Sequence, residues 1–412
     1  MSDEPVAEGE ETVEAPLLEL SDGLPPVVET PEALAETIAA LAEGTGPVAI
    51  DAERASGYRY SPRAYLVQLR RAGAGTALID PIPFGDLSDL GKALGDAEWV
   101  VHAASQDLAC LAELGLRPPS LFDTELAGRL LGYPRVGLGT LVETVLGKSM
   151  RKEHSAVDWS KRPLPEPWLE YAALDVEALL QLRDVLAAEL EDAGKTAWAL
   201  EEFEHVALAG PPGPRQDPWR RTSGMHRARG RRAMAAVREL WAARDELAER
   251  RDVTPGRIIP DSAIIEAANA MPGDTRALIE LKGFHGRGAH RYIQVWVSAL
   301  RRARQMPDAE LPPFAQRYDG PPPPRAWPDR NEPAARRLAR SREALRAIAD
   351  EHTLPVENLL TPDTLRRVMW EPPAATDGLL EEALASRLRE LGAREWQIGL
   401  TLAPLAEAIE AD

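Results

Sequence analysis

The chain has 412 residues, and this length predicts about two to four domains. It contains 48 Lys or Arg and 66 Asp or Glu, which gives a formal net charge of −18 at pH 7. It has one cysteine, Cys110, an acidic N-terminus unlike that of a signal peptide, and no apolar run of the roughly 18 residues that a membrane helix needs. These features exclude a disulfide-stabilised or membrane-spanning protein and predict a cytoplasmic one.

Charge is distributed unevenly along the chain. No Lys or Arg precedes Arg54, whereas residues 215–304 contain 19 Lys or Arg against 10 Asp or Glu. Residues 1–24 are acidic, lack aromatic side chains and show no hydrophobic period, so we predict a disordered tail. Because the local field decides what binds, the negative total does not exclude a nucleic-acid partner.

Residues 25–205 predict an α/β domain with a mixed sheet flanked by helices. Thr30 is expected to cap a helix that begins at Pro31. Closely spaced strands followed by alternating strands and helices predict an antiparallel meander that is extended by further strands. The predicted strands are 47–53, 64–69, 76–79 and 98–102, and residues 121–123 are expected to lead into another helix.

Two helical regions follow this domain. Residues 215–305 and 334–412 are predicted to be all-α bundles, and the Pro-rich segment 306–333 between them is predicted to be a linker. The second bundle is acidic and looks like a diverged copy of the first, so we expect it to position the first bundle or to narrow access to a site, not to bind nucleic acid directly.

Four carboxylates from three predicted elements are candidates for a metal site. Asp51 and Glu53 are two residues apart on a strand and therefore point to the same side. Asp107 begins a helix that follows a strand, and Tyr171 and Asp175 share one face of another helix. Taken singly, each acid is more often an ordinary solvated or helix-end residue than a metal ligand.

Together, these acids predict a catalytic site. Oxygen ligands suit hard divalent cations such as Mg²⁺ or Mn²⁺. Two such ions about 4 Å apart hydrolyse phosphodiester bonds by activating a water and stabilising the leaving oxygen. Tyr171, one helical turn from Asp175, is then placed to hold the attacking water.

The ordered motifs of residues 25–205 resemble the ribonuclease D family of the DEDD exonuclease superfamily. The matching segments are 50–53, 65–69, 102–108, 122–124, 158–164 and 171–176. The resemblance implies a ribonuclease-H-like fold and 3′-to-5′ hydrolysis with two metal ions bound by Asp51, Glu53, Asp107 and Asp175. The tyrosine form of the last motif implies that Tyr171 assists the water. The implied substrate is RNA with a free 3′ end, such as a tRNA precursor.

The segment 217–221, a helix starting at Arg231, and residues 281–284 resemble the helicase-and-RNase-D C-terminal (HRDC) domain. This resemblance implies a compact helical bundle that binds nucleic acid, and 334–412 resembles a second copy. We expect a monomer that needs no protein partner.

Two departures from the family pattern concern the first motif. Ala52 replaces the common threonine, and Arg54 follows where an aromatic residue is usual. Ala52 faces away from the acids, so metal binding is expected to survive, while the way the terminal nucleotide is held is open. Alternatives to an exoribonuclease are a DNA-directed 3′-5′ exonuclease in repair and a non-catalytic RNA-binding protein, and the complete acid set disfavours the latter.

The remaining polar residues near the motifs have less specific roles. His102 is expected to be a core residue and Asp123 a helix N-cap. Several side chains are candidates for substrate contacts, although a solvated surface role is the default for such charges. They are Gln68, Lys161, Arg162, Arg220, Arg221 and Lys282.

Overall fold

The computed structural model of the chain describes residues 15–151, 156–210, 213, 215–314, 319–374 and 380–411. Residues 1–14 of the predicted acidic tail lie outside these ranges. Among the described residues, no helix combines the length and the apolar character needed to cross a membrane.

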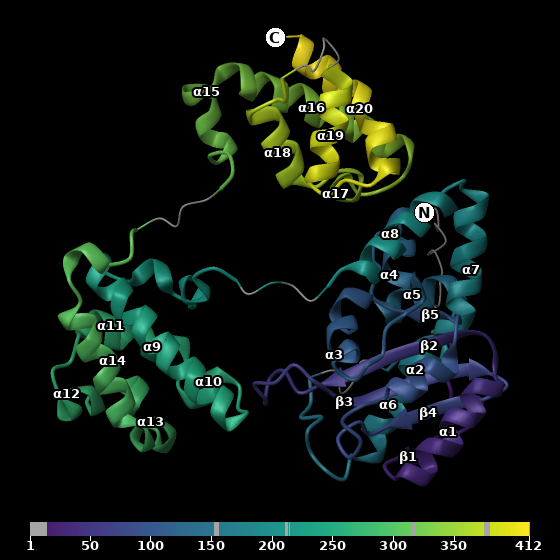
Figure 1. Ribbon diagram of the computed structural model, residues 1–412, viewed down its shortest axis with the longest axis horizontal. Coiled ribbons are helices and arrows are strands. Elements are labelled where there is room, and N and C mark those ends of the chain that lie inside the picture. The colour runs from purple at the N-terminus through teal and green to yellow at the C-terminus, as the bar shows by residue number, and fades with distance from the viewer. Residues whose placement is uncertain are drawn as a thin grey trace, which may run out of the picture.

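A six-stranded mixed sheet lies at the centre of the N-terminal region, with the strand order β1-β4-β3-β2-β5-β6 (Figure 1). The predicted antiparallel meander is confirmed by the pairing of β2 with β3 and of β3 with β4. The sheet continues with β5 parallel to β2 and β6 parallel to β5, while a short β1 that the sequence did not indicate pairs with β4. The strands are β1 (Val27–Val28), β2 (Thr45–Arg54), β3 (Ala64–Ala72), β4 (Gly75–Ile79), β5 (Glu98–Val101) and β6 (Ser120–Asp123).

Helices pack around this sheet. The predicted cap is confirmed, since the Thr30 hydroxyl accepts a hydrogen bond from the Ala33 amide and Pro31 is the first residue of α1. Helix α6 contacts β2, β3 and β4, whereas α7 contacts β2 and β5. The helices are α1 (Pro31–Glu43), α2 (Ser88–Leu94), the 3₁₀ turn η1 (Ala104–Gln106), α3 (Leu108–Glu113), α4 (Thr124–Leu130), α5 (Leu138–Leu146), α6 (Glu166–Glu177), α7 (Leu179–Asp192) and α8 (Thr196–Leu208).

The prediction of a disordered tail is wrong for residues 15–24. Leu17 pairs with Ser149 in a parallel bridge, and the Leu18 amide donates to the Ser149 carbonyl. Leu18 packs in the core with 7% of its surface exposed. The apolar side chains of this segment are stabilised by tertiary partners that local composition does not reveal.

The middle bundle has a hydrophobic core of its own. Trp296, Phe284 and Leu240 are fully buried in it. Its elements are η2 (Pro218–Arg221), η3 (Met225–Arg227), α9 (Gly230–Arg251), α10 (Pro255–Ile258), α11 (Asp261–Ala270), α12 (Thr275–Ile279), η4 (Lys282–Phe284), α13 (Arg287–Arg291), α14 (Ile293–Gln305) and η5 (Asp308–Glu310).

The C-terminal bundle includes part of the segment that was predicted to be a linker. Trp327 is fully buried, with its ring centre 5.0 Å from that of Trp370, and its indole N–H donates to the Pro322 carbonyl. The Pro-rich residues therefore pack against the bundle. Its elements are η6 (Pro324–Ala326), α15 (Trp327–Arg330), α16 (Glu332–Glu351), α17 (Val356–Leu359), α18 (Pro362–Trp370), α19 (Leu380–Glu390) and α20 (Glu395–Glu410).

The C-terminal bundle shares one hydrophobic core with the N-terminal domain. The Trp198 and Trp396 rings stack with centres 5.0 Å apart and an interplanar angle of 16°. The Lys195 ammonium donates to the carbonyls of Leu130 and His352. These contacts join α8 to the last bundle, so the two parts form a continuous packed unit.

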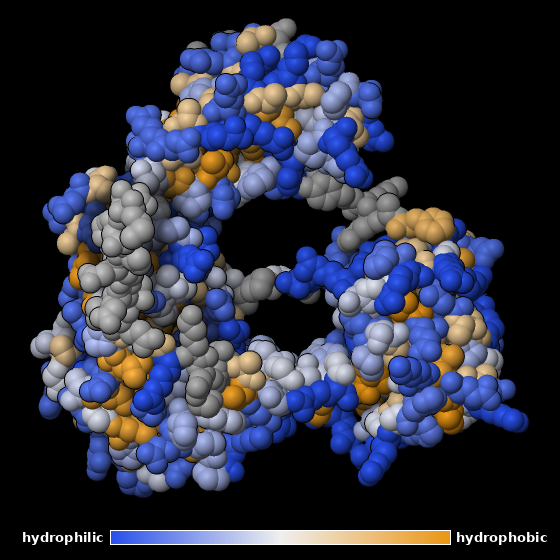
Figure 2. Space-filling model, turned by 180° about the vertical axis from the view of Figure 1, so that it is seen from behind, coloured by the Kyte–Doolittle hydropathy of each residue, from blue (hydrophilic) through white to orange (hydrophobic). Residues whose placement is uncertain are grey.

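The middle bundle contacts the N-terminal domain through residues 55–63, the 55–63 loop, which directly follows β2. The Thr254 amide donates to the Tyr58 carbonyl at 3.0 Å, and the Ser61 amide donates to the Asp252 carboxylate at 2.9 Å. In Figure 1 this loop extends from the sheet toward α10. Figure 2 shows a band of intermediate hydropathy joining the two parts beside an opening in the molecule. The strand that carries the first acidic motif therefore continues into the contact with the middle bundle.

Candidate active site

Strand β2 carries the first two acids at the middle of the sheet. Asp51 and Glu53 project to one side because side chains alternate along a strand, while Val48 and Ile50 are fully buried. Glu53 has only 9% of its surface exposed. The expected geometry of this pair is therefore present, on a strand with neighbours on both edges.

Asp107 enters the site from the turn between β5 and α3. Here Ala103 adopts a left-handed conformation with φ of 56°, and the predicted single helix is divided into η1 and α3 with Asp107 at the junction. The Asp123 carboxylate accepts hydrogen bonds from the Ala103 and Ala104 amides at 3.1 and 2.9 Å. It also accepts from the first amides of α4, which confirms its role as an N-cap. Asp123 thus fixes the strained turn that positions Asp107.

Helix α6 brings Asp175 and Tyr171 to the acids of β2. Ala172 and Ala173 are fully buried against the sheet, and their small side chains let the helix approach closely. The Tyr171 hydroxyl donates a hydrogen bond to the Asp175 carboxylate. The helix ends at Glu177, and α7 begins after one residue, so the apolar stretch that contains Tyr171 and Asp175 forms two helices.

These residues converge on one pocket. Carboxylate oxygens of Asp51, Glu53 and Asp175 lie within 4.8 Å of one another. The pocket has a volume of about 420 Å³, and Asp107 and Tyr171 also line it. The structure therefore brings together all five residues proposed from the sequence as the catalytic set.

The electrostatics of this pocket favour a bound cation. Burial raises the pKa of Glu53 to about 10, with Asp51, Asp175 and Asp107 adding to the shift through like-charge repulsion. Burial also raises the pKa of Asp107 to about 8, and that of Asp175 well above its usual value. Carboxylates held this close are compatible with ionisation at neutral pH only if positive charge lies between them. Their number, spacing and oxygen chemistry fit divalent ions such as Mg²⁺ or Mn²⁺.

Arg54 is the one cationic side chain from β2 that enters this pocket. Regular alternation along β2 would turn its side chain away from the acids, yet Arg54 lines the pocket, at the point where the pairing of β2 with β3 shifts register. Its guanidinium lies 3.4 Å from an Asp107 carboxylate oxygen. The residue that departs from the family pattern is therefore part of the site.

Gln68 is not placed to contact a substrate. It is fully buried on β3, and its amide nitrogen lies 3.5 Å from the Asp51 carboxylate. Gln68 therefore lies beneath the acids and contacts Asp51 instead of a strand bound in the pocket.

The two basic residues before α6 differ in availability. The Arg162 guanidinium uses all five of its N–H donors. It donates to the Asp80 carboxylate and to the carbonyls of Tyr65, Trp159 and Lys161. Arg162 therefore connects β3, β4 and the segment before α6, and no donor remains for a phosphate. Lys161 is exposed, with its ammonium 5.9 Å from the centre of the Trp168 ring.

The three candidates in the middle bundle do not line this pocket. Arg220 donates to the Asp217 carboxylate and to the Pro313 carbonyl, and it lies over the Trp219 ring, so it serves the packing of its own bundle. Arg221 and Lys282 are exposed. The pocket walls instead include Leu138, Gly139 and Met150, which no motif in the sequence had indicated.

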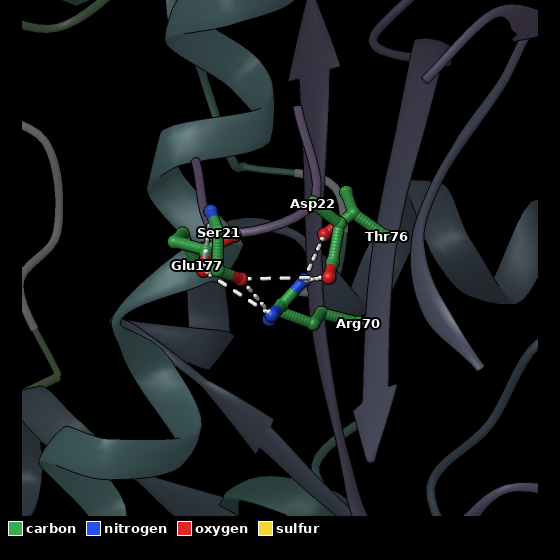
Figure 3. Close-up of polar contacts among 5 residues, drawn as sticks. All are labelled: Ser21, Asp22, Arg70, Thr76 and Glu177. Atoms are coloured by element: carbon green, nitrogen blue, oxygen red, sulfur yellow. Dashed lines mark hydrogen bonds and ion pairs between the residues drawn. The ribbon is translucent and has the colours of Figure 1, made fainter. Parts of the chain in front are cut away.

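A polar cluster at the surface of the domain holds the end of α6 (Figure 3). The Arg70 guanidinium donates to the hydroxyls of Ser21 and Thr76 and lies 2.9 Å from Asp22 and 3.2 Å from Glu177. Glu177 is two residues beyond Asp175, and Arg70 is two residues beyond Gln68. The cluster thereby joins the N-terminal segment, β3 and the helix that carries the fourth acid.

Arg70→Met is expected to lower the free energy of unfolding by about 2–4 kcal/mol, because it leaves the Glu177 side chain, which is 9% exposed, without its cation. Urea denaturation measures this change. Lys92→Met is the matched control, since its pair with Asp89 is fully exposed and should contribute much less to stability than the Arg70 pair. Equal effects of the two substitutions would show that the cluster does not stabilise the fold.

His102 predicts a specific pH dependence of stability. Partial burial lowers its pKa to about 4, and its Nδ1 lies 2.9 Å from the Thr124 hydroxyl, as expected for a core residue. In the unfolded chain a histidine has a pKa of about 6.5. The unfolded state therefore binds more protons between pH 6.5 and 4, and stability falls as the pH drops through this window. Between pH 7 and pH 5 the free energy of unfolding should fall by about 2 kcal/mol less in His102→Gln than in the original chain. Urea denaturation of both proteins at the two pH values measures this difference. Parallel pH profiles would contradict the prediction.

Comparisons with known proteins agree with this geometry. Residues 25–191 match the family model of a 3′-5′ exonuclease, residues 233–300 match that of the HRDC domain, and residues 320–409 match that of a 3′ to 5′ exonuclease C-terminal domain. Ribonuclease D of Granulibacter bethesdensis is 32% identical over 362 residues, which cover 84% of this chain and 88% of that protein.

Two solved structures extend the comparison. A protein from Bifidobacterium adolescentis is 38% identical with a TM-score of 0.87, covering 96% of this chain and 100% of that one. RNase D of Escherichia coli, described as an exoribonuclease involved in structured RNA processing, is 26% identical with a TM-score of 0.65 over 89% of this chain and 98% of that one. The predicted combination of a mixed-sheet exonuclease domain and helical bundles is thus shared with these proteins.

Proposed function

The chain belongs to the ribonuclease D family of 3′-5′ exoribonucleases, and from this premise we propose that it trims the 3′ ends of structured RNA, such as tRNA precursors, by two-metal-ion hydrolysis. One observation carries the proposal: carboxylate oxygens from β2 and α6 approach within 4.8 Å of one another, with Asp107 on the wall of the same pocket. Structured RNA is the substrate class because the related E. coli enzyme is described as acting in its processing.

The four carboxylates have a common role in this proposal. Asp51, Glu53, Asp107 and Asp175 would hold two Mg²⁺ or Mn²⁺ ions, for which their oxygens are suitable ligands. When bound, such a pair of ions activates a water molecule and stabilises the leaving oxygen. Asp123 and the Arg70 cluster keep the acids on their separate elements in position.

Tyr171 is assigned to the attacking water. Its hydroxyl is held by Asp175 on the same face of α6, so it is positioned beside the acids without carrying charge itself. Burial, together with the nearby carboxylates, raises the pKa of this hydroxyl, which therefore keeps its proton at neutral pH. A protonated phenol can donate one hydrogen bond and accept another, and it thereby orients a water for attack on the terminal phosphodiester.

The direct test uses RNA and DNA oligomers labelled at the 3′ or the 5′ end, incubated with the full chain and Mg²⁺, Mn²⁺ or chelator. Release of mononucleotides from the 3′ end of RNA, abolished by chelator, is the expected result. Release from the 5′ end, or hydrolysis that survives chelation, would contradict the mechanism. Faster hydrolysis of DNA than of RNA would instead favour a repair exonuclease.

Tyr171→Phe should slow hydrolysis by about 10- to 100-fold while leaving metal affinity unchanged, because only the hydroxyl that orients the water is lost. Single-turnover rates and Mn²⁺ binding by calorimetry measure the two quantities. Tyr133→Phe is the matched control, since its hydroxyl bonds to Glu189 and it does not line the pocket. An unchanged single-turnover rate would remove Tyr171 from the mechanism.

A further inference from the structure

A second, smaller pocket lies on the middle bundle between α10 and α13. It has a volume of about 190 Å³, and we call it the α10–α13 pocket. Drug-sized ligands occupy roughly 300–1,000 Å³, so this pocket has room for about one planar ring. Its wall includes Arg251, Val253, Arg257, Ile258, Arg291 and Tyr292.

The charge of this pocket is opposite to that of the chain. Three of its lining residues are arginines and none is acidic, in a protein whose net charge is −18. Arg251 and Arg291 are exposed at its rim, and clustered guanidiniums create a local positive field irrespective of the total charge. The ligand that this field attracts is an anion, and planar guanidiniums match phosphate groups.

The aromatic ring of Tyr292 adds a second requirement for the ligand of this pocket, beyond its negative charge. Tyr292 is half-buried, and the guanidiniums of Arg251 and Arg291 lie 6.0 and 5.7 Å from its ring centre. Val253 and Ile258 supply apolar walls beside the ring. Single-stranded nucleic acid is bound by this kind of arrangement, in which a base stacks on an apolar surface and arginines contact the phosphates on either side of it.

The position of the pocket connects it to the catalytic site. Arg257 lies 4.1 Å from the centre of the Tyr58 ring, and its Nε donates to the Gly57 carbonyl at 3.1 Å. Gly57 is four residues beyond Glu53, and four residues span at most about 14 Å. The rim of the α10–α13 pocket therefore begins within roughly 20 Å of the catalytic acids, a distance that about six stacked nucleotides cover at 3.4 Å each.

We propose that the α10–α13 pocket binds the single strand of the RNA substrate a few nucleotides upstream of the 3′ end that the catalytic pocket holds. The inference rests on the proposed function and adds a second, separate binding site to it. The two pockets share no lining residue, so their contributions are separable by mutation. The site explains how a chain with a negative net charge binds RNA. It also gives a function to the contact between the middle bundle and the 55–63 loop.

The test measures RNA affinity against length with the double variant Arg251→Gln/Arg291→Gln. Arg257 is left unchanged because it maintains the contact with the 55–63 loop. Oligoadenylates of three to sixteen nucleotides are titrated in Mg²⁺ into the full chain carrying Asp175→Asn, which prevents cleavage, with and without the two changes. Arg276→Gln/Arg301→Gln is the matched control, because it removes two exposed arginines of the same bundle that do not line the pocket.

In the chain with both arginines, affinity should rise with length up to about six nucleotides and then level off. The double variant should lose at least about 10-fold in affinity for the sixteen-mer and none for the trinucleotide. Its slope of log affinity against log salt should fall by about 1.4, as expected for two lost phosphate contacts to a single strand. An unchanged affinity for the sixteen-mer, or an equal loss in the control or for the trinucleotide, would overturn the inference.

Failure of the proposed function has a different signature. In chains that keep Asp175, hydrolysis of short RNA depends on the catalytic pocket alone, both with and without the arginine changes. If neither protein releases nucleotides with Mg²⁺ or Mn²⁺, the proposed function fails whatever the affinities are. If both do and the length dependence is the same, only the α10–α13 pocket is refuted.

Discussion

Asp175→Asn lowers the rate of 3′-end hydrolysis by at least about 10³-fold and leaves RNA affinity within about 3-fold. Substitutions of residues that only support a metal ligand typically cost 10- to 100-fold, and loss of an anionic ligand itself should cost more. The substitution preserves the shape of the side chain and its ability to accept the Tyr171 hydrogen bond. RNA contacts outside the metal site are unaffected, so affinity is retained.

The same substitution has a second expected result that distinguishes a metal ligand from a structural residue. Asp175 is 8% exposed, and burial together with repulsion from Asp51 raises its pKa, so its charge is unfavourable without a cation. In chelator, the Asn variant should therefore unfold at the same or a higher urea concentration, whereas in Mg²⁺ it should lose the stabilisation that the ion provides. Asp184→Asn, an exposed change on α7, serves as the control. Retained turnover, or equal stabilisation by Mg²⁺ in both proteins, would remove Asp175 from the ligand set.

The parts of the site that the sequence predicted are those that local geometry determines. Alternation along a strand puts Asp51 and Glu53 on one side, and helical spacing puts Tyr171 and Asp175 on one face, whatever the rest of the chain does. Their convergence with Asp107 depends on how three separate elements pack together. Local geometry does not determine this packing, and the sequence predicted it only because the ordered motifs resemble those of the ribonuclease D family. The short strand β1 lacked a strong local pattern, and its pairing with β4 depends on a distant partner.

The substrate contacts were harder to predict because a side chain's partners come from the whole fold. Arg162 and Arg220 look like phosphate ligands in the sequence, yet carbonyls and carboxylates far along the chain use their donors. Gln68 is polar but lies in a strand covered on both sides. Arg251 and Arg291 carried no motif, since the pocket that they share with Tyr292 forms only when α9 and α13 meet around α10.

The packing of the C-terminal bundle changes what its removal would test. The sequence predicted separate domains joined by a Pro-rich linker, and truncation after residue 210 would then separate catalysis from RNA binding. In the structure, Trp198 stacks on Trp396 and one hydrophobic core spans both parts. Truncation would expose this core, and a loss of RNA affinity would then be explained by unfolding. Point substitutions at the interface are the informative alternative.

Arg394→Met should lower the free energy of unfolding by about 3–5 kcal/mol, the second large effect that we expect. The Arg394 guanidinium binds both carboxylate oxygens of Glu202 on α8, and the Trp396 indole N–H donates to the same carboxylate at 2.9 Å. The side chain of Glu202 is 6% exposed, so removal of its cation leaves a buried charge without compensation. Urea denaturation measures the loss, and a single transition would show that the bundle and the exonuclease domain unfold together.

Two comparisons decide whether this pair holds the bundle in place. Arg389→Met breaks an ion pair with Glu395 on the same bundle, but both partners are more than half exposed, so it should destabilise the protein much less than Arg394→Met. Glu202→Leu combined with Arg394→Met removes both buried charges. The double variant should recover much of the stability that Arg394→Met alone loses, because the unpaired buried carboxylate causes most of that loss. If the double variant is as unstable as the single one, the interface depends on the ion pair itself. If Arg394→Met costs no more than Arg389→Met, the stacked tryptophans and the shared core alone keep the bundle on α8.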